Sequence, residues 1–510
     1  MPIRQRGQAL VFIVITTVIV LLGALALFNI AQLTTQKMKL QNTADAAAYS
    51  GALSEARDYN FTAYANRAMI ANQVAVAQLL GLTSWARNLD SVYKSGPFTW
   101  VPQTFSSLSA LGSLWNTQWN IAKPVANAIY TVLNNVGPVL VKALNFWIDA
   151  LSLGTSAYHM ATMLEVWLET VPTVISENDP NSKLSTSLTQ IGFGIKHAKD
   201  YWDFTSQYDP QVSNTGSKDY DSDRQTNVVF NSQDGFYNFR SYPWPLPLLI
   251  DPTKLIPGNF GTLFMMMYHS GGTEMKDTVS NKKSATWAAL DATGLFVILM
   301  VWIFVPFPVP IPIPLPLPQG YGAAYCGTGS GSSLLQPGSN NLNHNFAAAF
   351  GSTFVNPLTM APGWIKVGEG PGSNVDNNCG LKKYWDVTNR AQASSSANQN
   401  INGADLLIEV EKEVKHITLS SSTGAGGGAA TPMRIGGDAT GRLYLADGTQ
   451  DSKLKALSKA HAYFSRPNGL FARDDGKTEY GSLYNPYWQA KLLPNSLIEQ
   501  GFSILGQALP

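Results

Sequence analysis

The chain has 510 residues, 45% of them hydrophobic, which is enough for two to four domains of about 150 residues each. Its 35 Lys and Arg against 34 Asp and Glu leave a formal net charge of +1, so no basic stripe for nucleic acid is expected, and nucleic acid is excluded as a partner. Charged residues make up only 14% of the chain, against about 25% in ordinary soluble domains, which favours an exported or partner-covered protein over a cytosolic one.

A long apolar segment opens the chain. No charged residue occurs between Arg6 and Lys37, and Ala9–Ile30 is almost entirely apolar. About 20 such residues cross a bilayer as a helix, whereas a cleaved signal has only about 7–15 apolar residues before a small-x-small site. Here Ala24-Leu25-Ala26 lies inside the apolar segment. The segment therefore predicts a retained transmembrane anchor, with membrane lipid as a partner.

The orientation of this anchor depends on the basic residues around it. Arg4 and Arg6 precede the span, and Lys37 and Lys39 follow it, so the positive-inside rule gives no clear result by count alone. The two arginines lie closer to the apolar edge. This favours a cytoplasmic N-terminus, with the bulk of the chain periplasmic or extracellular.

The helical pattern continues beyond the span. The segment 41–56 is rich in Ala, a strong helix former, and contains no Pro. Asp45, Tyr49 and Glu55 do not belong to the main row on one face of this helix. The row recurs every four residues and consists mostly of small side chains: Leu40, Ala44, Ala48, Ala52 and Ala56. Because small residues let another helix approach closely, the row predicts helix packing at its alanines. One helix over 8–56 would be about 70 Å long.

Four sequence motifs carry a resemblance to a known family. They are RGQAL at Arg6–Leu10, LQNTADAAAYSGA at Leu40–Ala52, NRAMIANQVAVAQ at Asn66–Gln78 and SLYNPYWQAKL at Ser482–Leu492. The chain resembles TadE/TadG-like proteins of the bacterial Tad (Flp) pilus system over about its first 90 residues and a short patch near its end. The resemblance implies a minor pilin or an assembly protein of the inner membrane, with other pilin-like or Tad secretion-system proteins as partners.

Prepilin processing is the next implication of this resemblance. Type IV prepilins are cut after a Gly and carry Glu at the fifth mature position, where it pairs with the new amine of a neighbouring subunit. Here the cut would fall between Gly7 and Gln8, and the fifth position is Phe12, which cannot form that pair. The chain also contains no D-x-S-x-S motif, so the metal-dependent adhesion domain of many TadG-like proteins is not expected.

Helical segments follow the anchor helix up to residue 208. Residues 57–89 continue the helical pattern, and a second helical block is expected at 104–173, interrupted near Pro124 and at Gly137-Pro138. A third helix is expected at 183–204. We therefore predict three parts: a transmembrane, pilin-like helix over 1–56, a helical domain over 57–208, and a β-rich exported domain over 209–510. The fold class is α+β.

The β-rich part is predicted from short aromatic segments separated by Gly and Pro, which begin near residue 228. Moderate alternation predicts a strand at 408–420. Polar and glycine-rich composition predicts loops at 209–227 and 420–431. A short helix is expected at 452–465.

A proline-rich segment, PFPVPIPIPLPLP at 306–318, has proline at every second position, and 11 apolar residues precede it. A second membrane helix is disfavoured, because each interior proline costs about 3 kcal/mol and the part able to form a helix is too short to cross a bilayer. In a strand, successive amides point to opposite edges, so these prolines would leave one edge able to pair. An edge strand or hairpin is favoured over a polyproline II rod.

Little in the sequence indicates chemistry. Cys326 and Cys379 would form one disulfide in an oxidising compartment or remain buried thiols; export favours the disulfide slightly. No two of the six histidines are three to five residues apart, so each is interpreted as a surface histidine or a hydrogen-bonded core histidine. We expect no catalytic residue, no cofactor and no metal site.

Three functions remain open on this evidence. The favoured one is a membrane-anchored pilin-like or assembly component of a Tad/Flp-type pilus that acts by helix packing and is not an enzyme. The alternative is a pilus-tip adhesin that binds a surface through the β-rich region. The third is a membrane-tethered hydrolase whose catalytic groups lie far apart in the sequence.

Overall fold

The structure is a computed structural model that describes most of the helical half of the chain and parts of the β-rich half. The described ranges are 6–95, 109–208, 240–243, 263–278, 283–305, 307–326, 344–350, 368–369, 382–388, 401–413, 416–417, 453–466 and 481–508. The loops expected at 209–227 and 420–431 and Cys379 lie outside these ranges. The disulfide between Cys326 and Cys379 therefore stays a prediction.

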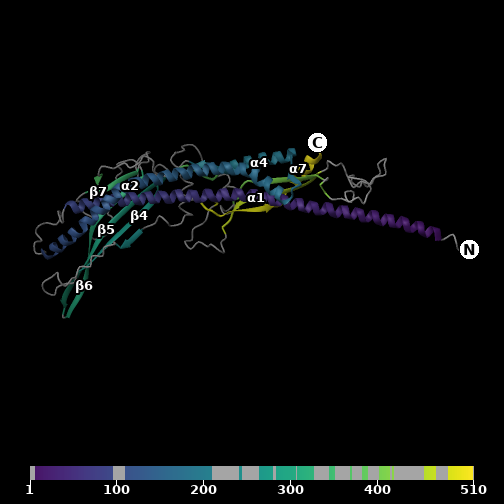
Figure 1. The fold of residues 1–510 in the computed structure, drawn as a ribbon. Helices are drawn as coiled ribbons and strands as arrows, with labels where there is room; N and C mark the ends of the chain where they lie inside the picture. The colour runs from purple at the N-terminus through teal and green to yellow at the C-terminus, as the bar shows by residue number, and fades with distance from the viewer. Residues whose placement is uncertain are drawn as a thin grey trace.

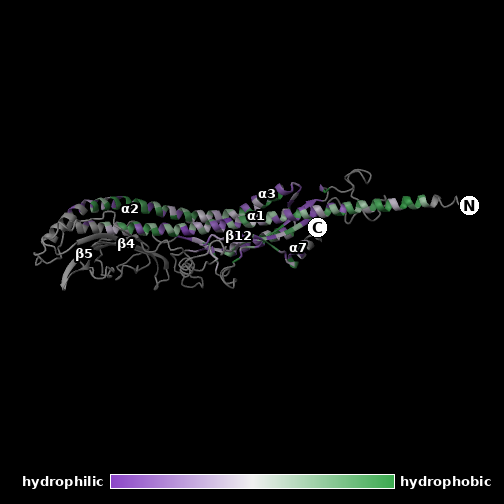
Figure 2. Ribbon diagram, turned by 90° about the horizontal axis from the view of Figure 1, so that it is seen from below, coloured by the Kyte–Doolittle hydropathy of each residue, from purple (hydrophilic) through white to green (hydrophobic). Residues whose placement is uncertain are grey.

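The first helix, α1, dominates the molecule. It runs from Arg6 to Ser95 without a break, which is about 135 Å at 1.5 Å per residue. The predicted continuous helix is confirmed, and it extends to the residue before Gly96-Pro97, where Pro97 disfavours a helical Gly96. Its apolar start projects beyond the remainder of the chain (Figure 1) and is the most hydrophobic part of the ribbon (Figure 2).

The second helix, α2 (Ser109–Glu165), lies beside α1 and runs back towards the anchor end (Figure 1). A π-helical turn, η2 (Val166–Thr170), and α3 (Val171–Asn178) continue it. The interruption expected at the two prolines is wrong, because Pro124 and Pro138 both lie inside α2. An interior proline removes one i→i−4 hydrogen bond and its ring crowds the preceding turn, at a cost of about 3 kcal/mol. Long contact with α1 offsets that loss, and a Cβ on Gly137 would stand 3.1 Å from Thr83 Oγ1 of α1.

A short strand, β1 (Ser182–Leu184), precedes the next helix, α4 (Leu188–Phe204). The helix expected from residue 183 therefore starts later than predicted. Ser187 sets its start, since the Ser187 side chain accepts a hydrogen bond from the Gln190 backbone amide at 3.1 Å. Strand β2 (Thr205–Tyr208) follows directly and pairs with β9 (Tyr384–Val387).

An antiparallel sheet of four strands packs on α1, in the order β1-β10-β11-β12. Strand β10 (Leu406–Glu413) overlaps the strand predicted at 408–420 and ends at Glu413. The short helix expected at 452–465 is wrong, because this segment is strand β11 (Lys453–Phe464). It pairs with β10 on one edge and with β12 (Trp488–Leu493) on the other, and this pairing overrides the helical preference of its alanines. The closing helix α7 (Leu497–Ala508) lies near the point where α1 leaves the body (Figure 1).

The proline-rich segment forms strand β6 (Phe307–Cys326), and the apolar residues before it belong to strand β5 (Lys283–Val305). The two strands form a hairpin with register from Val305–Phe307 to Ala288–Tyr325. Among the described strands, the other edge of β6 pairs only at Gly322–Cys326, with β7 (His344–Phe350). The predicted edge strand or hairpin is therefore confirmed over the proline-rich part. The same sheet includes β3 (Arg240–Pro243), β4 (Leu263–Thr278) and β8 (Gly368–Glu369).

Candidate functional site: the covered face of the anchor helix

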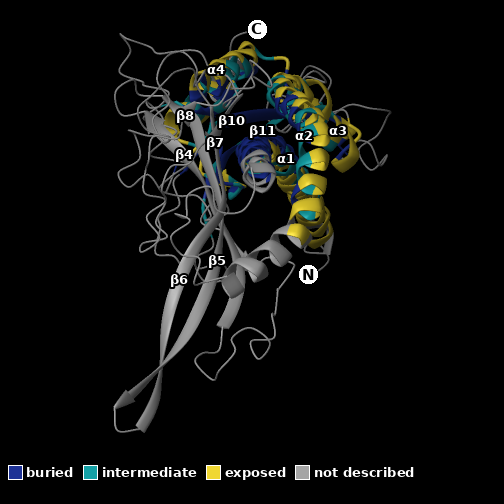
Figure 3. Ribbon diagram, turned by 90° about the vertical axis from the view of Figure 1, so that its left-hand side faces the viewer, coloured by how far each residue is buried: buried dark blue, intermediate teal, exposed yellow. Residues whose placement is uncertain are grey.

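The row of small residues on α1 lies in the centre of a hydrophobic core (Figure 3). Leu40, Ala44, Ala48 and Ala52 are all 0% exposed. The side chains that cover them come from η2 and α3 and from the sheet, and include Val166, Val171, Ile175, Leu406, Ile408, Val410, Ala456 and Ala460. The expectation that this face docks onto helices of other proteins is therefore corrected. Its small residues bring the chain's own sheet and α3 close to α1.

Gly51 shows how close this approach is. A Cβ at this position would clash with the side chain of Leu406 and would stand 3.3 Å from Val166 Cγ1. A residue with a side chain at this position would force the Leu406 side chain of β10 to move. The covered face is thus matched to one fixed partner surface within the chain.

A buried polar contact joins α1 to α4 just beyond the alanine row. Glu55 Oε1 lies 2.5 Å from His197 Nε2, and both side chains are 0% exposed. Trp167 Nε1 donates to His197 Nδ1 at 3.2 Å. Because the indole can only donate, Nδ1 must be the accepting nitrogen, and Nε2 carries the proton that His197 donates to Glu55.

A second buried network joins α1 to α2 and α4 one turn further along. His159 Nδ1 lies 2.5 Å from Asp58 Oδ2, and His159 Nε2 lies 2.8 Å from the Thr205 hydroxyl. The Tyr201 hydroxyl donates to the same Asp58 oxygen at 2.9 Å. Burial, followed by the nearby Asp58 carboxylate, raises the pKa of the Tyr201 phenol well above its usual value, which keeps this donor protonated.

These two networks are better suited to holding helices than to catalysis. Glu55, Asp58, His159 and His197 are each no more than 1% exposed, so a substrate has no access to them. The interpretation of His159 and His197 as hydrogen-bonded core histidines is confirmed. Within the described ranges no group of three or more His, Cys, Asp or Glu side chains is placed to hold a metal ion. The sequence could not reveal these pairs, because their members are 101 and 142 residues apart.

Two of the quoted motifs, 66–78 and 482–492, meet in space. The Asn66 side-chain amide donates to Leu483 O at 2.7 Å and to Trp385 O at 2.9 Å. Arg67 donates to Tyr484 O at 3.2 Å. Six residues before the first motif, Asn60 accepts from the Trp488 amide at 3.0 Å and donates to Trp488 O at 2.9 Å. Side chains of α1 therefore hold the C-terminal segment through its backbone.

Replacing Asn66 with alanine is expected to lower the free energy of unfolding by about 2–3 kcal/mol, because two buried carbonyls lose their donor. Asn72→Ala is the matched control. Asn72 donates only along its own helix, to Ala68 O at 2.8 Å, so its loss should change stability by less than about 0.5 kcal/mol. Urea unfolding of the two variants measures the difference, and equal stabilities would contradict the bridging role of Asn66.

The face of β10 that points away from α1 is charged and buried as well. Glu409 is 0% exposed, lies 3.1 Å from Lys455 Nζ and accepts from the Ser503 hydroxyl at 2.6 Å. Lys412 lies on the opposite face, towards α1: its Nζ donates to Gln36 Oε1 of α1 at 2.9 Å and to Asp179 Oδ2 at 2.8 Å, and the Lys412 and Asp179 side chains are no more than 3% exposed. Because each buried charge has a partner, these pairs fix β10 between α1, α4 and α7, and breaking one would be costly. Lys39, just past the membrane span, also reaches Asp179, at 3.6 Å.

Asp405 gives the sheet a pH dependence that can be measured. Burial acts to raise the pKa of this carboxyl, but hydrogen bonds from His461 and Lys459 outweigh it and lower the pKa from 3.8 to about 2. A lowered pKa stabilises the fold above the unfolded-state value, and this contribution disappears as the pH falls from 3.8 towards 2. Because the side chain is 34% exposed, we expect only about 1 kcal/mol.

The measurement is urea unfolding as a function of pH. Asp405→Asn should be about 1 kcal/mol less stable than the natural chain at neutral pH and equal to it near pH 2. Asp200→Asn is the control, since the Asp200–Lys196 pair has side chains 35% and 60% exposed and should contribute little at any pH. A difference for Asp405→Asn that persists at low pH would show that packing, not charge, is responsible.

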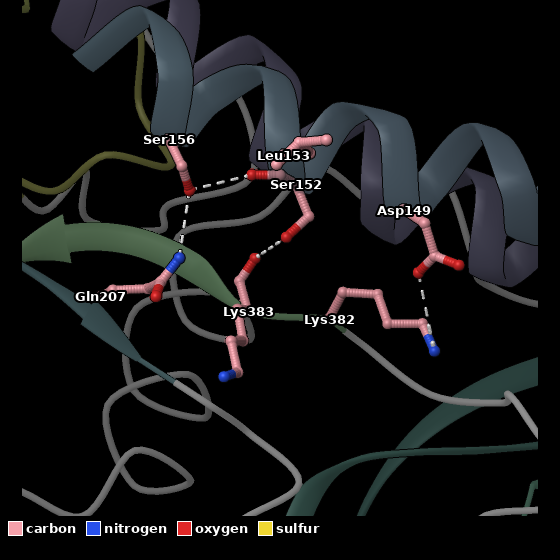
Figure 4. Close-up of a pocket in the computed structure, with 7 residues that line it drawn as sticks. All are labelled: Asp149, Ser152, Leu153, Ser156, Gln207, Lys382 and Lys383. Atoms are coloured by element: carbon pink, nitrogen blue, oxygen red, sulfur yellow. Dashed lines mark hydrogen bonds and ion pairs between the residues drawn. The ribbon is translucent and has the colours of Figure 1, made fainter. Parts of the chain in front are cut away.

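A shallow hollow lies between α2 and the β2–β9 pair (Figure 4). Its polar groups are used within the chain: Ser152 Oγ donates to Lys383 O at 2.6 Å, and Gln207 donates to Ser156 Oγ at 3.1 Å. An ion pair joins Lys382 to Asp149 at 3.8 Å. The hollow is therefore a junction between elements, and it brings together no nucleophile and base.

Within the described part of the chain, two helical segments are long and apolar enough to cross a membrane, Ala9–Ala86 and Lys123–Asn178. The most apolar window of the first is 0% buried, and that of the second is 22% buried. The uncovered first segment indicates membrane anchoring. Gly7 and Gln8, the predicted cleavage site, lie in the first turn of α1, and cleavage there stays a prediction.

No curated protein and no solved structure matches the chain. A family model matches its N-terminal part only, so the resemblance of 66–78 and 482–492 lies outside the matched residues. The match covers the anchor and the whole alanine row. Residues 7–56 of this chain match the family described as "Putative Flp pilus-assembly TadE/G-like".

Proposed function

We propose that this protein is a single-pass inner-membrane component of a Tad/Flp-type pilus assembly system, with its N-terminus in the cytoplasm and its body exported. One observation carries the proposal. A single continuous helix is exposed over 9–24, within its apolar segment, and is covered by the chain's own sheet from Leu40 onwards. This arrangement suits a rigid anchor that holds a folded body at a fixed height.

The anchor helix is proposed to act as a rigid support for the exported body. From Ile30 to Ser95 the helix extends about 100 Å at 1.5 Å per residue, and α2, α3 and the sheet pack along that length. The three parts proposed from the sequence, 1–56, 57–208 and 209–510, would thus be held on one rod. The uncovered apolar segment is the surface offered to lipid and to the membrane helices of other pilin-like or Tad proteins.

We infer that the protein does not act as an enzyme. The TadE/G-like match points to an assembly role, and the buried carboxylate–histidine pairs have no access for a substrate. The proposed work is mechanical: α1 positions the body, and the body contacts pilus or assembly proteins.

The uncovered segment also bears on whether the protein enters a pilus shaft. Phe12 is 71% exposed and offers no carboxylate to the amine of a neighbouring subunit. We therefore propose that the protein stays in the membrane and assists assembly. Mass spectrometry of the membrane-purified chain should find an N-terminus before Gly7, and a mature N-terminus at Gln8 would contradict this part of the proposal.

Deletion and fractionation test the proposed function. Cells lacking the protein should lose pili, and a tagged full-length copy should restore them while staying in the membrane fraction after pili are sheared off. Recovery of the copy with the sheared pili would favour the alternative, a pilus-tip adhesin that uses the β-rich region. Normal piliation without the protein would overturn the proposal.

A further inference from the structure

The folded body begins close to the membrane. Two contacts between the sheet and α1 lie just beyond Ile30: Lys412 Nζ of β10 donates to Gln36 Oε1 at 2.9 Å, and Lys37 Nζ donates to Lys455 O of β11. Gln36 and Lys37 are about 9–11 Å further along α1 than Ile30, and the headgroup layer of one leaflet is about 5–8 Å thick. This end of the sheet therefore stands at the outer edge of the lipid headgroups.

The strands of this sheet run along α1, so heights above the membrane can be compared across it. Lys455 contacts Lys37 at the lower end. At the upper end Phe464 pairs with Trp488, which exchanges two hydrogen bonds with Asn60. From Lys455 to Phe464 the strand extends about 30 Å, and from Lys37 to Asn60 the helix extends about 35 Å. Because the two lengths nearly match, residues paired across the sheet lie at nearly one height.

Lys183 of β1 is level with Lys37. In the register of the sheet Lys183 lies opposite Glu411, and Glu411 lies opposite Lys455, whose carbonyl accepts from Lys37. The Lys183 side chain is 56% exposed, and its Nζ lies 3.7 Å from Glu411 Oε1, which is beyond hydrogen-bond length. Glu411 is 2% exposed and already accepts from Lys453 at 2.9 Å. Charge alone holds Lys183 there, and its N–H donors stay available.

Lys39 repeats this arrangement on α1. Its side chain is 50% exposed, and its Nζ lies 3.6 Å from Asp179 Oδ1, again beyond hydrogen-bond length. Asp179 is 2% exposed and accepts from Lys412 at 2.8 Å. The same Lys412 ammonium donates to Gln36, so Lys39 Nζ lies near the height of Gln36. In both places one buried carboxylate is shared by two lysines, which leaves positive charge on the exposed side.

We name Lys37, Lys39 and Lys183 the lysine platform. Lys37 is exposed and donates to a carbonyl, which has no net charge to neutralise the ammonium. Glu413, which is 27% exposed, lies 3.8 Å from Lys183 but also lies opposite Lys453 in the sheet. Three exposed ammonium groups, contributed by α1 and β1, are therefore held at one height beside the membrane.

We propose that the lysine platform binds the phosphate groups of anionic phospholipids in the leaflet from which α1 emerges. Ammonium groups bind phosphate as point charges, and the height of the platform brings them to the plane of lipid phosphates. The contact fixes the tilt and rotation of the body, which a single membrane helix leaves free. The inference rests on the proposed function only for a membrane placed at Ala9–Ile30.

Native mass spectrometry of the full-length chain in detergent tests this contact, with phosphatidylglycerol and phosphatidylcholine of the same acyl chains as probes. The natural chain should bind phosphatidylglycerol more tightly. Lys39→Gln with Lys183→Gln should weaken phosphatidylglycerol binding about 25-fold and leave phosphatidylcholine binding unchanged. Lys39→Arg with Lys183→Arg keeps both charges and should retain the preference. Equal binding of the two lipids by the natural chain would overturn the proposal.

The matched control is Lys196→Gln with Lys199→Gln. These lysines of α4 are 60% and 72% exposed and also form ion pairs. They flank His197, which contacts Glu55, about 38 Å further along α1 than Ile30. This pair should leave the lipid preference unchanged. An equal loss in the control would show that total charge, not the platform, attracts the lipid, and would overturn the proposal.

Two further measurements separate the lipid from other anions and this inference from the proposed function. Inorganic phosphate that displaced phosphatidylglycerol at equal concentration would assign the platform to a free ion and overturn the lipid contact. Lost piliation in Lys39→Gln with Lys183→Gln, without any lipid preference in the natural chain, would assign it to an acidic protein instead. A membrane-bound chain that supports piliation but shows no lipid preference would overturn this inference alone. A chain found outside the membrane would overturn both.

Discussion

Replacing Ala48 with leucine is expected to disrupt the packing of the sheet and α3 on α1 while leaving membrane insertion intact. Ala48 is 0% exposed in a core shared by α1, η2, α3 and the sheet. Leucine adds three heavy atoms to a site without free space, and overpacking of this kind costs about 1–3 kcal/mol. We expect a lower free energy of unfolding, protease-sensitive strands and loss of piliation. The apolar segment Ala9–Ile30 is unchanged, so the chain should still fractionate with membranes.

The matched control is the same substitution at Ala31, which lies on α1 but is exposed. Ala31→Leu should leave unfolding and piliation unchanged. Thermal unfolding of the purified full-length chain in detergent, followed by circular dichroism, compares the two variants. Equal stabilities would show that the face around Ala48 is not a packed core. Normal stability of Ala48→Leu with lost piliation would instead restore the original expectation that this face docks onto another protein.

The sequence revealed which face of α1 is covered, but not what covers it. The four-residue recurrence of small residues marked a packed face correctly, because periodicity reports which side of a helix is covered. It could not report the partner. That partner is a sheet whose strands β10 and β11 lie more than 350 residues further along the chain, and small residues admit a strand as readily as a helix.

The errors elsewhere have a similar origin. Strand β11 was expected to be a helix because KLKALSKAHAYF is rich in alanine and lysine, and its pairing with β10 and β12 decided otherwise. Pro124 and Pro138 were expected to interrupt α2, and contact with α1 carries the helix through both. In contrast, the strand at 306–318 was predictable because proline at alternate positions acts locally: it removes donors from one edge, wherever the rest of the chain lies.

Two aspartates placed in the centre of the apolar segment are expected to release the protein from the membrane. In Val18→Asp with Leu22→Asp, each carboxylate costs about 2.5–3.5 kcal/mol at the middle of a membrane helix, so insertion becomes less favourable by about 5–7 kcal/mol. Aspartate is chosen because acidic residues contribute little to the positive-inside rule, so orientation should not change in molecules that still insert. Carbonate extraction followed by immunoblotting measures the membrane fraction.

The control places the same two charges just outside the span, in Thr35→Asp with Met38→Asp, at positions that are exposed. These aspartates face the interfacial region and should leave anchoring unchanged. Full membrane retention of Val18→Asp with Leu22→Asp would mean that Ala9–Ile30 is not the span. The anchoring segment would then have to be sought in Lys123–Asn178. Loss of retention in the central pair alone would place the membrane at Ala9–Ile30 and the covered helix outside it.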